Sequence, residues 1–96
     1  MKKIVFSKHA LLKIEEWKLS PETVEAVVTR PDSLFFDILS RALVAIKKVE
    51  IGDVETNLIV VFKPEDGGTR VITAYPCKNI DKEVKAKEGK RWLKIK

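Results

Sequence analysis

The chain has 96 residues, of which 45% are hydrophobic and 34% are charged, and its formal net charge is +5. This length provides one domain with one modest core, and the balance of apolar and charged residues is typical of a soluble globular protein. The longest apolar run, residues 58–62, is far too short to cross a bilayer, so we expect no membrane span.

The N-terminus and the cysteine content indicate a cytoplasmic protein. Residues 1–3 lead into only a short apolar run before polarity returns, so we expect no secretory signal. Cys77 is the only cysteine, which excludes an internal disulfide, and no second Cys or His stands at metal-ligand spacing from it. We therefore expect neither a metal site nor a cofactor. The absence of Gln and the abundance of Lys and Glu are typical of proteins from thermophiles.

Two short helices are expected in the first third of the chain. Residues 3–6 read as a strand, after which Ser7 caps a helix whose apolar positions recur at helical spacing: Ala10, Leu11, Ile14 and Trp17. Ser20 and Pro21 mark the next start, because a proline at the first helical position lacks only an N–H that would be unpaired anyway. Its inner stripe is Val24, Val27 and Val28. Residues 30–31 end this helix, since the residue before proline avoids helical angles.

Strand-like segments follow as far as residue 76. Three are clear and one is weaker: residues 43–51, 57–62 and 70–75, with residues 34–38 as the weaker one. The turns between the later strands are so short that these neighbours must be antiparallel. A last helix is expected from Ile80 to about Glu88, ended by Gly89. The sequence therefore predicts one α+β domain over residues 1–96, in which two N-terminal helices pack on a twisted antiparallel sheet of about four strands, followed by a short C-terminal helix.

The excess of positive charge lies entirely in the C-terminal segment. Residues 1–77 hold eleven basic and eleven acidic residues, whereas residues 78–96 hold eight basic and three acidic ones. A concentrated basic segment attracts polyanions such as RNA, or an acidic partner chain. The alternative interpretation is a solvated C-terminal helix with no binding role.

His9, the only histidine, is the first candidate for chemistry. Its ordinary pKa suits proton transfer near neutrality, and a helix N-terminus favours the neutral imidazole. The alternative is a solvated polar residue in a first helical turn. Strand alternation places Thr73 and Tyr75 on one face together with Val71, and two hydroxyls beside a core valine indicate a site. β propensity alone is the other explanation for these two residues.

Other constellations are weak. The sequence has no glycine-rich phosphate loop, and a serine hydrolase would have only His9 as a base. Among the acidic residues, Asp32 and Asp37 are expected to be solvated rather than to bind a metal.

Several runs of residues, in this order and spacing, resemble a family of small prokaryotic domains. The runs are Phe6-Ser7-Lys8-His9-Ala10-Leu11, Leu19-Ser20-Pro21-Glu22 with Arg30-Pro31-Asp32, and Val71-Ile72-Thr73-Ala74-Tyr75-Pro76. That family has no characterised function and is grouped by structure with RelE-type and BrnT-type toxins, in the barnase, EndoU, colicin and RelE assemblage. The resemblance covers about residues 4–76 and reappears at residues 89–92.

The resemblance implies a RelE-like fold and a toxin-like, metal-independent endoribonuclease, acting on RNA alone or on the ribosome and held inactive by an antitoxin protein. In that chemistry a base removes the ribose 2′-hydroxyl proton, cations stabilise the phosphate charge and an acid protonates the leaving oxygen. The catalytic residues that the resemblance implies are His9, Thr73, Tyr75 and Arg91. The RNA-binding residues expected beside them are Arg41, Lys47, Lys90 and Lys94.

The sequence departs from the family pattern after His9. Relatives usually carry arginines in a run like His-Ala-x-x-Arg followed by Glu-Arg-Gly, where this chain has Lys13 and Trp17. Lysine keeps the charge but loses the bidentate fork that holds phosphate, and tryptophan carries no charge. This departure favours a second hypothesis, a non-catalytic module that binds RNA or protein on the same fold. The position of the His9 ring relative to Thr73, Tyr75 and Arg91 distinguishes the two hypotheses.

Overall fold

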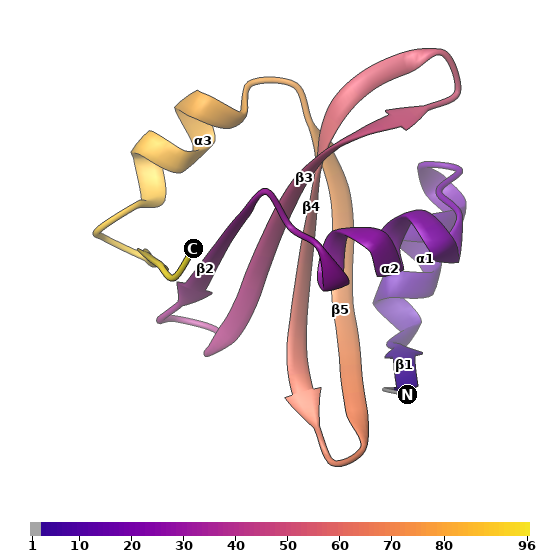
Figure 1. Ribbon diagram of the computed structural model, residues 1–96, viewed down its shortest axis with the longest axis horizontal. Coiled ribbons are helices and arrows are strands. Elements are labelled where there is room, and N and C mark those ends of the chain that lie inside the picture. Colours follow the sequence, from indigo (N-terminus) through magenta and orange to yellow (C-terminus); the bar gives the residue numbers. More distant parts are fainter. Residues whose placement is uncertain (1–2) are drawn as a thin grey trace.

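Three helices and six strands make up residues 3–96, the part of the chain that the computed structural model describes (Figure 1). In chain order they are β1 (Lys3–Phe6), α1 (Lys8–Glu16), α2 (Pro21–Thr29), β2 (Ser33–Asp37), β3 (Ala42–Ile51), β4 (Val54–Glu65), β5 (Gly68–Cys77), α3 (Ile80–Lys87) and β6 (Trp92–Lys94). Met1 and Lys2, the first residues of the stretch in which no secretory signal is expected, lie outside the described residues. Within residues 3–96, no helix has the length and apolar character needed to cross a membrane.

All six strands belong to one mixed sheet with the order β1-β5-β4-β3-β2-β6. Strands β2 to β5 pair as antiparallel neighbours, as their short turns require. At one edge β1 pairs in parallel with β5, and at the other edge β6 pairs antiparallel with β2. The structure is α+β, but the predicted RelE-like sheet of about four antiparallel strands is wrong.

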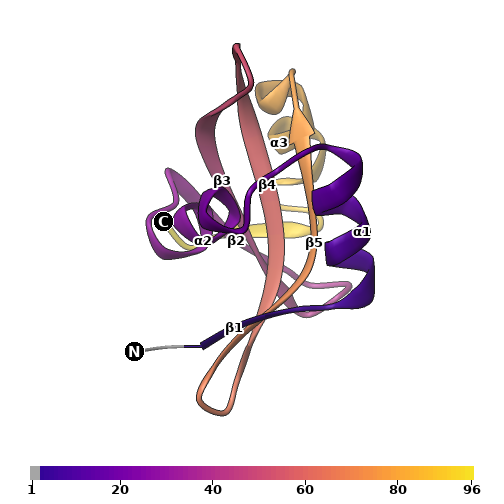
Figure 2. The same cartoon turned by 90° about the vertical axis from the view of Figure 1, so that its right-hand side faces the viewer.

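The error lies at the two edges of the sheet, where pairing depends on tertiary contacts. Strand β1 has only four residues, and its register runs from Lys3 opposite Gly68 to Phe6 opposite Val71. Helices α1 and α2 carry the chain across the sheet before β2 begins, which lets β1 lie parallel to β5 (Figure 2). Strand β6 has only three residues, too few for a period of two to be recognised.

The first two helices begin where the sequence predicts. The Ser7 side chain accepts a hydrogen bond from the backbone N–H of Ala10 at 3.0 Å, and Ser20 accepts one from Thr23 at 3.1 Å. Each serine therefore pairs one of the N–H groups that a helix start leaves without a partner.

Only part of the predicted apolar stripe of α1 reaches the core. The buried residues of the two helices are Ala10, Ile14, Val24 and Val27. Leu11 is 53% exposed and Trp17 is 43% exposed, so the prediction that they face the core is wrong. A helix this short buries only the residues directly opposite the sheet.

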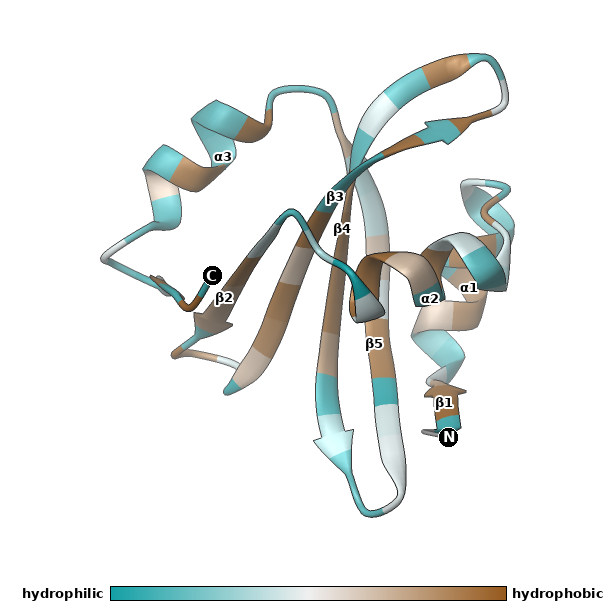
Figure 3. Cartoon of the chain, viewed as in Figure 1, coloured by the Kyte–Doolittle hydropathy of each residue, from teal (hydrophilic) through white to brown (hydrophobic). Residues whose placement is uncertain are grey.

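Each face of the sheet carries its own apolar cluster. Figure 3 shows hydrophobic residues along the middle of the central strands. Helices α1 and α2 cover one face, which we call the helical face, and its cluster includes Leu58, Val60, Val71 and Ala74. Helix α3 lies on the other side of the sheet (Figure 1), and we call that side the α3 face. The cluster of the α3 face consists of Phe35, Val44, Ile46, Ile59 and Trp92.

A β-bulge in β5 overturns the predicted orientation of Val71. Val61 of β4 pairs with Thr73, but the next residue, Phe62, pairs with Val71, so Ile72 is an extra residue. Val71 therefore packs into the helical face. Thr73 and Tyr75 lie together on the α3 face, opposite Val61 and Ile59.

Candidate nucleic-acid interface

A buried carboxylate joins the end of β2 to the segment that follows α3. Asp37 is only 4% exposed, and Nε of Arg91 donates to both of its carboxylate oxygens at 3.0 Å. The backbone N–H groups of Leu39 and Ser40 donate to the same carboxylate. Burial alone would raise the pKa of Asp37, but these donors together hold that pKa below its ordinary value. Asp37 is therefore an ionised anchor for Arg91, and the expectation that it is a solvated surface acid is wrong.

Arg91 keeps most of its hydrogen-bonding capacity for a ligand. Within residues 3–96, the hydrogen bonds and the ion pair of the Arg91 side chain use Nε alone, and this side chain is 41% exposed. The hydrogen bond to Asp37 raises the pKa of Arg91, so the guanidinium stays charged. A guanidinium presents five N–H donors in a planar fork that matches the oxygens of a phosphate. Asp37 thus orients a cation whose outer nitrogens are available to bind an anion.

Tyr75 lies on the α3 face within the electrostatic influence of Arg91. Burial raises the pKa of Tyr75 above its ordinary value, and the charges of Lys87 and Arg91 offset part of that rise. The phenol is therefore protonated at neutral pH and donates a hydrogen bond, whereas a base would need the phenolate. Thr73 adds a second hydroxyl on the same face.

Trp92 ties α3 to the edge of the sheet. Its ring is buried, with its centroid 5.5 Å from that of Phe35. Nζ of Lys87, at the end of α3, lies 5.0 Å from the centroid of the Trp92 ring and forms an ion pair with Glu83 one turn earlier. These contacts hold the end of α3 and Arg91 beside the α3 face.

The remaining lysines of the C-terminal segment are all exposed, and together we call them the basic edge. Within the described part of the chain, only Lys87 and Arg91 of this segment form ion pairs. The basic edge consists of the exposed lysines Lys78, Lys82, Lys85, Lys90, Lys94 and Lys96. Its charge is therefore open to a polyanion in solution.

His9 does not join these groups. It is an exposed residue of α1 and lines a shallow surface hollow together with other side chains of the same helix, among them Leu12 and Lys13. Helix α1 packs on the helical face, and no hydrogen bond or ion pair in residues 3–96 links His9 to Thr73, Tyr75 or Arg91. Of the four predicted catalytic residues, the α3 face thus gathers the two hydroxyls and the arginine.

The predicted RNA-binding residues are divided in a similar way. Lys90 and Lys94 belong to the basic edge. Arg41 is exposed in the turn between β2 and β3, where its backbone N–H donates to the carbonyl of Asp37. Lys47 lies elsewhere, because its register on β3 puts it on the helical face. There it donates to the carbonyl of Arg30 at 2.9 Å and pairs with Asp32.

Sequence reasoning did not name Lys87 and interpreted Asp37 as a solvated acid, so neither residue was expected at this interface. Asp37 and Arg91 are 54 positions apart, and no spacing rule connects residues at such a separation. The proline-free, apolar character of residues 92–93 is the only local signal that this segment returns to the sheet.

Within residues 3–96, no three His, Cys, Asp or Glu side chains gather as a metal site. No protein-family model, no curated protein and no solved structure matches the chain.

Proposed function

We propose that this protein binds RNA through the basic edge, with Arg91, Tyr75 and Thr73 of the α3 face as additional contacts. The observation that carries the proposal is the separation of charge. Residues 1–77 are formally neutral, and the lysines of the basic edge have no ion-pair partner among the described residues. Lysines that neutralise phosphates release counterions, and this release supplies most of the affinity of a protein for nucleic acid.

The groups beside the lysines favour a phosphate backbone as the bound anion. Arg91 offers a fixed fork of donors, and the hydroxyls of Tyr75 and Thr73 offer neutral donors on the same face. Such a mixture of cations and hydroxyls is typical of contacts to phosphate and sugar. The cytoplasm, where RNA is abundant, is the location that this proposal assigns to the protein.

The test measures the affinity of the purified protein for a labelled single-stranded RNA over a range of salt concentrations. The triple variant K82Q/K85Q/K90Q removes three charges of the basic edge and keeps polar side chains of nearly the same length. We expect weaker binding and a salt slope reduced by about two, because each contact to a single strand contributes about 0.7.

The matched control is K3Q/K8Q/K63Q, which removes three exposed lysines outside the basic edge. It makes the same change in net charge, and we expect it to leave most of the salt slope in place. Equal losses from the two triple variants, or an affinity that does not depend on salt, would refute the proposal. Capture of an acidic protein with no affinity for RNA would favour a protein-binding module instead.

Cleavage of the bound RNA is a second candidate function, supported by the placement of Thr73, Tyr75 and Arg91 on one face. Under this second proposal, the protein is a toxin-like ribonuclease that acts on free RNA or on the ribosome. An acidic antitoxin that covers the basic edge would then block access to RNA.

A further inference from the structure

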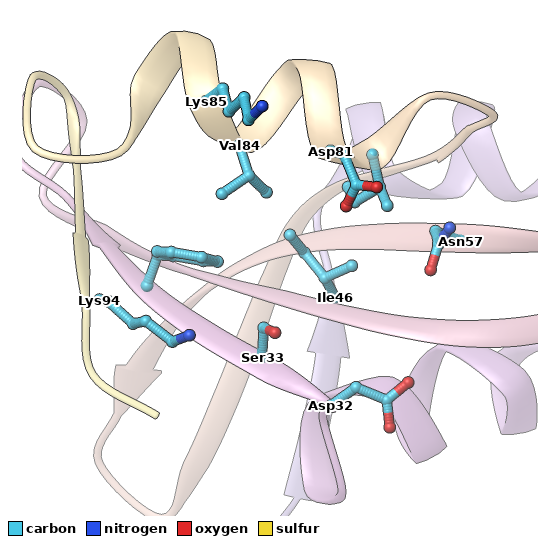
Figure 4. Close-up of a pocket in the computed structure, with 10 residues that line it drawn as sticks. Asp32, Ser33, Ile46, Asn57, Asp81, Val84, Lys85 and Lys94 are labelled. Atoms are coloured by element: carbon cyan, nitrogen blue, oxygen red, sulfur yellow. The ribbon is translucent and has the colours of Figure 1, made fainter.

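An open groove runs between α3 and the sheet (Figure 4). It has a volume of about 390 Å³, and its apolar lining includes Ile46 from β3 and Val84 from α3. Helix α3 contains no buried residue and touches the α3 face through partly buried side chains such as Val84. The helix therefore stands away from the sheet and leaves room for a flat group.

Polar side chains lie around this apolar lining. Asn57 of β4 and Ser33 of β2 both line the groove, and neither side chain forms a hydrogen bond to the protein within residues 3–96. An amide offers donors and an acceptor, and a hydroxyl offers both. The groove thus combines an apolar surface with unpaired groups that can recognise the edge of a planar, polar ring.

The charges at the rim suit a phosphate chain that passes over the groove. Figure 4 shows Lys85 on α3 and Lys94 on β6 on different sides of Ile46 and Val84. Both lysines belong to the basic edge. Asp81 lies one turn before Lys85, so the rim is not purely basic.

Asp32 is the other acid that lines the groove, and its charge is largely offset. The backbone N–H of Lys48 donates to it at 2.9 Å, and Lys47 forms an ion pair with it at 3.6 Å. These contacts, led by the hydrogen bond from Lys48, hold the pKa of Asp32 below its ordinary value. The two lysines and two carboxylates that line the groove balance formally, and Lys47, paired with Asp32 from outside the groove, adds one positive charge.

We propose that this groove takes one unpaired base of a single-stranded RNA, held between Ile46 and Val84, with Asn57 and Ser33 on the base edge and Lys85 and Lys94 on the flanking phosphates. The inference rests on the proposed RNA binding and deepens it. A base in a duplex is stacked and its pairing edge is occupied, so it cannot enter. The groove therefore gives the protein a preference for single strands that its lysines alone would not give.

The test compares a single-stranded RNA with an abasic strand of the same length and charge. Both carry the same phosphates, so the basic edge binds both, and only the first can fill the groove. We expect the unmodified protein to bind the strand with bases at least about fivefold more tightly, because contacts to a single base are worth roughly 1–3 kcal/mol.

Two variants test whether the groove causes the preference for the strand with bases, and neither changes the net charge of the protein. N57L replaces the amide by an apolar group of the same branching, and S33V removes the hydroxyl. We expect each to reduce the preference for the strand with bases several-fold while the salt slope stays unchanged. The matched control is T69L, which replaces a polar residue by an apolar one near the start of β5, outside the groove. Thermal unfolding checks that every variant is folded.

The possible failures are distinguishable. Equal affinity for the two strands with a normal salt slope would overturn the groove proposal and leave RNA binding by the basic edge intact. A preference that survives in both N57L and S33V would also overturn it, because the bases would then bind elsewhere. Absence of binding to either strand would refute the proposed function, and this inference with it.

Discussion

Asp37 and Arg91, 54 positions apart in the chain, are joined by two hydrogen bonds of 3.0 Å from one guanidinium nitrogen to the two carboxylate oxygens. The carboxylate is buried, and the guanidinium is partly exposed. This pair connects the end of β2 to the residue before β6, and it fixes a cation whose charge lowers the pKa of Tyr75. The same pair therefore stabilises the fold and positions a residue that we propose contacts RNA.

Loss of the Asp37 charge should destabilise the fold in acid. The pKa of Asp37 is lower in the folded protein than its ordinary value of 3.8, so its stabilising effect is complete above pH 4 and disappears as the pH falls through the lowered pKa. D37N should lower the free energy of unfolding at pH 7 by about 1–2 kcal/mol, because the hydrogen bonds to a charged carboxylate are weakened while water reaches the Arg91 side of the pair. Urea unfolding from pH 7 to pH 2 measures both effects. If the free energy of unfolding of D37N fell as steeply in acid as that of the unmodified protein, Asp37 would not be the cause of the acid destabilisation.

Ser7 should contribute more to stability than the equivalent cap of the second helix. Its hydroxyl accepts from Ala10 and donates to the carbonyl of Ile72 in the bulge at 2.9 Å, so it joins α1 to β5. S7A should cost about 1–2 kcal/mol, near the upper end for a helix cap. S20A, which removes an exposed cap, is the matched comparison and should cost less. Chemical denaturation of both variants measures the difference, and equal costs would show that the bond to Ile72 contributes little.

Gly68 should be required for the parallel pairing of β1 with β5. A Cβ atom at this position would overlap the backbone oxygen of Lys3, its partner in the sheet. G68A should therefore displace β1 and destabilise the protein by about 1–3 kcal/mol. The control is G52A, where a Cβ meets no atom within 4 Å and only the positive φ causes strain. Thermal unfolding and protection of the β1 amides from hydrogen exchange report the result, and unchanged protection in G68A would contradict the pairing.

The single tyrosine of the chain makes its ionisation directly measurable. Ultraviolet absorbance in an alkaline titration follows only Tyr75, and its midpoint should lie above the ordinary value of 10.0 because the hydroxyl is partly buried. K87Q should raise the midpoint further, since that cation lowers the pKa, and E83Q should reduce it. A midpoint at or below 10.0 would place Tyr75 in water, away from the α3 face.

The His9 side chain should contribute little to RNA binding, because it lies on α1 and not with the α3 face or the basic edge. H9A should keep its affinity for RNA within about twofold, since one contact at most is lost. Cleavage is measured in the same samples after treatment with a chelator, with and without ribosomes. Products with cyclic phosphate ends that form with the unmodified protein and not with H9A would establish His9 as a catalytic residue and contradict this expectation.

The sequence by itself determined the local elements and the distribution of charge. Serine caps at positions 7 and 20, the proline at position 21 and the alternation of the central strands act over a few residues, so the helix starts and the central strands could be predicted. The neutral body and the basic segment are properties of composition. Sequence reasoning also named Thr73 and Tyr75 as a pair, because two residues of a strand separated by one position share a face.

Only the tertiary structure decided which distant groups meet. The parallel pairing of β1, the addition of β6 and the contact of Asp37 with Arg91 join segments whose spacing carries no periodic signal. The bulge at Ile72 reversed Val71 relative to Thr73, since one extra residue changes the face of every residue before it. The separation of His9 from the hydroxyls follows from the packing of α1 on the helical face, which no single segment of the chain encodes.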